Sequence, residues 1–277
     1  MPPESGLTLA EAAEDFRAAC HAELNAFKPG NVHIFRPGHG MTVATFERAA
    51  EVAAVRLVAG RTVGERIESA VKASLAAVGC NANLGILLLA APLVEAAFAS
   101  APNEPLRSAL ARVLKRLTVE DAAAAYRAIA AANPGGLGRA DEHDVAAPPT
   151  ITLREAMAAA ADRDRIALQY VTDFEDVFAA AAAYERHSGT RETVEDVYLG
   201  LLGLFPDSHI ARKFGGEIAE RVRREASAFA TRLDVEPDRD RALDAFDLHL
   251  KAQGINPGTT ADLTVAAVFA AKLQARG

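Results

Sequence analysis

Tryptophan is absent from this 277-residue chain, and aromatic residues make up only 6% of it. Half of the residues are hydrophobic, largely through alanine, and β-branched residues are few. Alanine is the best helix former, and small side chains let helices approach closely. No segment shows the two-residue alternation of a half-buried strand, and neither heptads nor short repeats are sustained. We therefore predict an all-α fold, a single helical domain over 1–277 with about ten helices and almost no sheet.

Cysteine is scarce as well. Cys20 and Cys80 are isolated, which excludes a disulfide framework and a zinc pattern, and Cys80 is expected to be buried beside an apolar run. The net charge of −7 argues against a nucleic-acid partner, because phosphate backbones bind basic surfaces. Residues 1–8 lack the pattern of a signal peptide, and the longest apolar run, 84–98, is too short to span a bilayer. These features predict a cytoplasmic protein with no membrane partner.

Several common catalytic motifs are missing. The chain has no GxxxxGK[ST] loop, which excludes a P-loop nucleotidase, and no HExxH or GxSxG, which excludes two common hydrolase classes. Gly136-Leu137-Gly138 follows no predicted strand and is therefore no dinucleotide fingerprint.

Helix starts recur as a threonine followed three residues later by an acid, the capping-box spacing. The pairs are Thr8/Glu11, Thr62/Glu65, Thr118/Asp121, Thr152/Glu155 and Thr193/Asp196. Gly60 and Gly254 stand where helices end. The predicted helices are 8–27, 42–59, 63–78, 84–99, 105–116, 119–132, 153–185 with a possible break near Asp162, 194–205, 208–233, 238–253 and 260–275. The segment 133–149, rich in proline and glycine, is predicted to be irregular.

The most informative stretch is 256–262, Asn-Pro-Gly-Thr-Thr-Ala-Asp. A Pro-Gly turn enters a helix whose free N–H groups and dipole favour phosphate, so Gly258, Thr259 and Thr260 are candidate phosphate contacts. Asp262 beside phosphate suggests a Mg²⁺ ligand or a proton-handling group. The alternative is an ordinary threonine N-cap followed by an acid that complements the dipole.

Three further polar clusters interrupt the helical pattern. One comprises Glu23, Lys28, Gly30, Asn31 and His33, where a helix ends and lysine with free amides can face an anion; the alternative is a plain C-terminus. In the second, Asn81 and Asn83 either orient a ligand or cap the apolar helix that follows. In the third, Asp207, His209, Arg212 and Lys213 open a helix in a pattern that suits a phosphorylated ligand with Mg²⁺. The alternative is that Asp207 and Ser208 are plain caps and that Arg212 and Lys213 form a solvated face. Asp247 and His249 are expected at the surface or the edge of the core.

Four of these segments together resemble the triphosphoribosyl-dephospho-coenzyme A synthase family. They are KPGNV (28–32), GCNANLGI (79–86), PDSHIARK (206–213) and GINPGTTADL (254–263), in that order. The resemblance covers the chain from about Ala18 to its end and implies an all-α fold. Asn133-Pro-Gly-Gly-Leu-Gly with Glu142-His-Asp is similar to a branch from methanogenic archaea and methylotrophic bacteria.

The resemblance implies a transferase that joins ATP, as a substrate, to 3'-dephospho-CoA with loss of adenine, assisted by Mg²⁺. On that basis Lys28, Arg212 and Lys213 are expected to hold phosphate, and Glu23 to act as acid or base. Asp207 and Asp262 would be Mg²⁺ ligands or the base. Gly30, Asn31, His33, Asn81, Asn83, His209 and residues 258–260 would contact the substrate.

The sequence departs from the family pattern at two places. His33 stands where the family commonly has aspartate, and NANLG replaces THKG, with loss of a lysine and a histidine. These departures favour a second hypothesis, an enzyme that makes a one-carbon carrier coenzyme of the methanopterin or methanofuran type from another phosphorylated substrate. A third hypothesis is a non-catalytic helical binding protein. An alanine-rich helical surface is also compatible with a homo-oligomer.

Overall fold

The computed structural model describes residues 6–134, 144–187, 189–233 and 235–276. Within these ranges the chain forms 14 α-helices and no strand. They are α1 Leu9–Asn25, α2 Val43–Ala59, α3 Val63–Val78, α4 Leu84–Phe98, α5 Leu106–Lys115, α6 Val119–Ala132, α7 Leu153–Ala158, α8 Arg165–Val171, α9 Glu175–Arg186, α10 Arg191–Leu204, α11 Ser208–Phe214, α12 Gly216–Leu233, α13 Arg239–Ala252 and α14 Gly258–Gln274. The predicted all-α bundle is confirmed.

Threonine caps begin most of the predicted helices. Thr8, Thr118 and Thr152 form full capping boxes, and the Thr62 hydroxyl accepts the N–H of Glu65. The assignment of Thr193 as a cap is wrong, because α10 begins two residues earlier behind Thr190. Thr193 lies inside the helix, where its hydroxyl donates to the carbonyl of His187 at 2.8 Å.

Two predicted helices are divided in the structure, which accounts for most of the difference in number. The segment 153–185 breaks near Asp162, as predicted, where Asp164 caps α8, and again at Phe174, whose φ is +58°. The segment 208–233 breaks at Gly215, with φ +91° and ψ 159°, a conformation open almost only to glycine.

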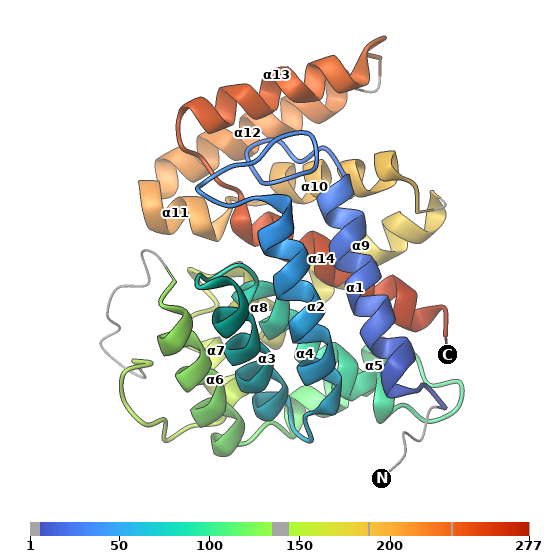
Figure 1. Ribbon diagram of the computed structural model, residues 1–277, viewed down its shortest axis with the longest axis vertical. Helices are drawn as coiled ribbons and strands as arrows, with labels where there is room; N and C mark the ends of the chain where they lie inside the picture. The colour runs from blue at the N-terminus through green and yellow to red at the C-terminus, as the bar shows by residue number, and fades with distance from the viewer. Residues whose placement is uncertain (1–5, 135–143, 188, 234, 277) are drawn as a thin grey trace.

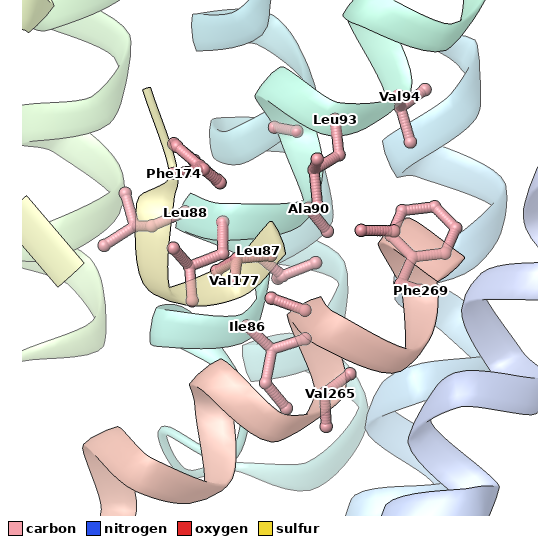
Figure 2. Close-up of a cluster of buried hydrophobic side chains, with 14 of the residues drawn as sticks. Ile86, Leu87, Leu88, Ala90, Leu93, Val94, Phe174, Val177, Val265 and Phe269 are labelled. Atoms are coloured by element: carbon pink, nitrogen blue, oxygen red, sulfur yellow. The ribbon is translucent and has the colours of Figure 1, made fainter. Parts of the chain in front are cut away.

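Helix α14 lies in the middle of the bundle and packs against α1, α4, α9, α10 and α11 (Figure 1). Apolar residues surround it on all sides, so it has no solvent face for most of its length. Figure 2 shows Val265 and Phe269 of α14 against Ile86 and Ala90 of α4. Because the buried helix α14 packs along α4, the start of α14 is fixed relative to the start of α4.

A second, smaller apolar cluster joins α10, α11, α12 and α13. There Phe229 of α12 stacks on Phe246 of α13 with ring centres 4.6 Å apart. The loop between α1 and α2 lies beside α13 (Figure 1). Arg36 of this loop forms an ion pair with Asp244 of α13. Whether the two clusters form a single domain stays a prediction.

Several sequence-based expectations concern the remaining segments. Cys20 is buried, but Cys80 is partly exposed, so the expectation of burial is wrong there. Gly136, Gly138, Glu142 and His143 lie outside the described residues. No described helix is long and apolar enough to cross a membrane.

Candidate active site at converging helix starts

Asp207 ties together the starts of two helices. As the N-cap of α11, its Oδ1 accepts the backbone N–H groups of His209 and Ile210 at 2.8 and 3.0 Å. Its Oδ2 accepts the N–H and the hydroxyl of Thr260 in α14, both at 2.8 Å. A carboxylate offers about four lone pairs, and all four are used here. Asp207, which is 1% exposed, therefore anchors α11 to α14 and keeps no free oxygen site.

The hydroxyls at the start of α14 serve the fold in the same way. Thr259 Oγ1 accepts the N–H of His209 at 3.2 Å, and both Thr259 and Thr260 are buried. Gly258 lies against the imidazole of His209, since an added Cβ would stand 3.4 Å from two of its ring atoms. The predicted phosphate contacts of this turn thus bond to α11.

A buried ion pair lies where α1 ends. The ammonium of Lys28 forms an ion pair with the carboxylate of Glu23. Lys28 is 0% exposed and Glu23 is 5% exposed. Lys28 Nζ is also 3.3 Å from Asn31 Oδ1, and the Asn31 amide donates to Asn256 Oδ1 at 2.8 Å. Asn256 lies two residues before α14 begins, so the ion pair is linked to the start of that helix.

Asp262 differs from Asp207 in its surroundings. Its side chain is partly exposed and forms no hydrogen bond or ion pair with any residue the structure describes. It faces the first turn of α4, where a Cβ on Gly85 would lie 2.0 Å from Asp262 Oδ2. Only glycine leaves room for the carboxylate at this position.

The start of α4 supplies two amide side chains to the same junction. Asn81 Oδ1 accepts the N–H of Leu84 at 3.2 Å, so Asn81 performs the capping role. Asn83 is 6% exposed, and its Nδ2 is buried without a hydrogen-bond partner. The NANLG segment thus combines one satisfied cap with one amide donor left unused.

The ionisable groups of this junction act on one another. Burial raises the pKa of Asp262 well above its usual value, and the carboxylates of Glu23 and Asp207 add to the effect. Burial also raises the pKa of Glu23 and lowers that of Lys28, each opposed by its partner. The hydrogen bonds from Thr260 to Asp207 and from Asn31 to Asn256 place these groups around the start of α14.

The cations of α11 divide between two environments. Arg212 Nη1 pairs with Asp164 Oδ2 at 2.6 Å, and its charge lowers the pKa of Asp262. Lys213 is exposed and lies 5.3 Å from the centre of the Phe214 ring, with no ion pair to a described residue. Burial, followed by the charges of Arg212 and Lys213, lowers the pKa of His209 to about 4. Arg212 belongs to the junction, whereas Lys213 lies in solvent.

His33 lies in a neighbouring cluster under the loop that follows α1. Its side chain is fully buried, with Nε2 3.4 Å from both Asp247 Oδ1 and Lys251 Nζ. Asp247 is 0% exposed, so its expected place at the surface or the core edge is wrong. The helical spacing of Leu243, Phe246 and Leu250 places position 247 on the buried stripe, which is the signal that could have identified it.

Among the described residues, no group of three or more His, Cys, Asp or Glu side chains could hold a metal ion. The groups that do converge are Glu23, Lys28, Asn31, Asn83, Asp207, Arg212 and Asp262. They form a charged junction where α4 and α14 begin and α1 ends, which suits a polyanionic ligand at helix N-termini.

Comparison with known proteins identifies the family of this chain. The sequence profile of the ATP:dephospho-CoA triphosphoribosyl transferase family matches residues 9–277. The chain belongs to this family. A comparison with curated proteins gives no match.

A crystal structure from Archaeoglobus fulgidus has a similar fold, with a TM-score of 0.66 and 26% sequence identity. The match covers 83% of this chain and 97% of the archaeal one, which carries the provisional name triphosphoribosyl-dephospho-CoA synthase. As a member of the ATP:dephospho-CoA triphosphoribosyl transferase family, the protein is a transferase, and the hypothesis of a non-catalytic binding protein is wrong.

Proposed function

We propose that this enzyme transfers the triphosphoribosyl group of ATP to the 2'-hydroxyl of 3'-dephospho-CoA and releases adenine. The reaction takes place at the junction where α4 and α14 begin. One observation supports this site above the others: Asp262 is a partly exposed, unpaired carboxylate with a raised pKa, next to the buried Glu23–Lys28 pair.

The chemistry is a glycosyl transfer at the anomeric carbon of the ATP ribose. The bond from this carbon to adenine breaks, and adenine leaves with the electron pair and takes up a proton. The bond to the acceptor oxygen forms, and the hydroxyl proton passes to Asp262. The transition state has oxocarbenium character, as in other glycosyl transfers. A carboxylate with a raised pKa binds a proton more strongly, and is thus a stronger base, than an ordinary one.

Binding of the triphosphate requires a positive electrostatic potential from groups whose positions are fixed. The starts of α4 and α14 supply the positive ends of two helix dipoles, and the first turn of α4 adds backbone N–H groups, whereas the N–H of Thr260 in α14 is already bonded to Asp207. Lys28 and Arg212 add two cations held in place by Glu23 and Asp164. Asn83 offers its unused amide donor for a polar edge of the nucleotide.

The expected Mg²⁺ fits this site only as part of the substrate. Mg²⁺ is usually held by one or two carboxylates together with phosphate oxygens and water. Asp207 has no free lone pair, because four hydrogen bonds occupy it. The described residues thus form no metal centre of their own, and Mg²⁺ would arrive on the triphosphate of ATP.

The proposal is tested by mixing the protein with Mg-ATP and measuring free adenine by chromatography, with dephospho-CoA, with CoA, or with no acceptor. We expect adenine only with dephospho-CoA, in equal amount to an adduct that carries the triphosphoribosyl group. A raised melting temperature of the protein would show that ATP binds. Binding of ATP without release of adenine in the presence of dephospho-CoA would contradict the proposal.

A second candidate is the synthesis of a one-carbon carrier coenzyme from another phosphorylated substrate. His33, in place of the common family aspartate, is enclosed by Asp247 and Lys251, and Asn81 and Asn83 replace a more basic segment. An acceptor of the methanopterin or methanofuran type would then be joined to a phosphorylated donor. The same adenine assay with pterin and furan precursors separates the two candidates.

A further inference from the structure

The turn that carries Lys28 and Asn31 is held at its backbone by side chains from elsewhere in the chain. The N–H of Phe27 donates to Glu195 Oε1 at 2.9 Å, and the Tyr198 hydroxyl donates to the carbonyl of Pro29 at 2.8 Å. The N–H of Gly30 donates to Asp247 Oδ1 at 2.8 Å. Helices α10 and α13 thus hold this turn from one side.

The other side of the turn packs against the chain that leads into α14. Gly30 has φ +86°, and a Cβ there would lie 2.8 Å from Pro257 Cδ and 3.2 Å from the Ile255 carbonyl oxygen. An added side chain would not fit on that side. The position of Gly30 therefore decides where Lys28 and Asn31 stand relative to α14.

Asp247 is well suited to hold this turn because ion pairs fix its own carboxylate in place. Its carboxylate lies 3.0 Å from Lys251 Nζ and 3.2 Å from Arg36 Nε, besides its contact with His33. Burial alone would raise the pKa of Asp247, but the bonds from His33, Gly30 and Lys251 outweigh it and lower the pKa. The side chain is thus a fixed anion on α13.

We propose that Asp247 is a positioning residue of the transfer reaction, which acts by fixing the Gly30 amide and, through it, the turn that carries Lys28 and Asn31. The proposal rests on the proposed function for its kinetic consequence. Its structural consequence, the order of the turn, can be measured independently of any reaction.

The test compares Asp247→Ala, which removes the acceptor, with Asp247→Asn, which keeps an oxygen for the Gly30 amide. Asp244→Ala is the matched control, since Asp244 lies on the same helix and pairs with Arg36 but does not contact the turn. Hydrogen exchange of the segment 27–33 and steady-state adenine release are measured for each variant, with melting temperature as a check on folding. If Asp247→Ala does not fold, Asp247→Ser, too short to reach Gly30, takes its place.

We expect Asp247→Ala to raise exchange in 27–33 about tenfold and to lower kcat about 10- to 100-fold, since small misplacements of a site are costly. Asp247→Asn should restore both within about threefold, and Asp244→Ala should leave both unchanged. Unchanged exchange in Asp247→Ala, or an equal effect of Asp244→Ala, would overturn the proposal. If the wild type releases no adenine, the proposed function fails, while the exchange result still decides the role of Asp247.

Discussion

Asp207 and Asp262 are the same residue type, and the sequence offers no way to tell their roles apart. Both follow a Pro-containing turn at a helix start. In the structure, Asp207 accepts four hydrogen bonds, whereas Asp262 accepts none from described residues. The difference arises partly from tertiary packing, because two of the four hydrogen bonds of Asp207 come from Thr260, in a helix 53 residues further along the chain. We therefore propose Asp262, rather than Asp207, as the reacting carboxylate.

The Glu23–Lys28 pair makes a prediction about stability. Replacing one member, as in Glu23→Gln or Lys28→Met, leaves a buried charge without its partner and should cost about 3–5 kcal/mol of unfolding free energy. The double variant should cost clearly less than the sum of the two single changes. Urea unfolding at pH 7 measures all three. Additive losses would show that the two side chains do not depend on each other.

His209 makes a prediction about pH. Its pKa is about 4 in the native state against 6.5 when unfolded, so between these values the unfolded chain binds a proton that the native protein does not. Stability contributed by neutral His209 is thus present above pH 6.5 and is lost as the pH falls toward 4. The variant His209→Gln should lose less stability than the wild type between pH 7 and about 4.5.

Thermal unfolding at the two pH values measures this difference. His21→Gln, at an exposed position on α1, corrects for the loss of one imidazole. An equal loss of stability in the wild type and in His209→Gln would contradict the assignment.

At the scale of elements, local sequence signals determine the helix boundaries more closely than they determine the contacts between helices. Capping threonines and glycine ends place most helices within one or two residues, since these signals depend on neighbours in the chain. The break at Gly215 carries a local signal, because two adjacent glycines disfavour a continuous helix, although the helical pattern on both sides predicts one. Only the φ of +91° at Gly215 separates α11 from α12.

Gly215 and Gly216 give a matched pair of substitutions. Neither has any atom within 4 Å of an added Cβ, so the comparison isolates the backbone. Gly215→Ala should cost about 1–3 kcal/mol, because alanine is strained at this φ and ψ. Gly216→Ala, in the first turn of α12, should be neutral or stabilising by about 0.4–1 kcal/mol. Equal effects in denaturant unfolding would show that the break does not depend on the conformation of Gly215.

At the scale of the whole molecule, the sequence predicts the fold class and the family but only part of the site. Helical composition and four motifs in order suffice for the first two, as the match over 9–277 shows. Burial of Asp247 and exposure of Lys213 depend on which helix face meets a neighbour, and a motif does not specify this. The convergence of α1, α4 and α14 on one junction follows from the buried axis of α14, which no local pattern reveals.

The central claim is that Asp262, at the junction of α4 and α14, is the base of the transfer reaction. The measurement that tests it most directly is the rate of adenine release by Asp262→Asn, with Asp162→Asn as a control at an exposed acid. A positioned base contributes about 10²- to 10⁴-fold, so we predict a loss of at least about 100-fold in Asp262→Asn with an unchanged helical circular dichroism spectrum. Near-normal adenine release by Asp262→Asn would contradict the account.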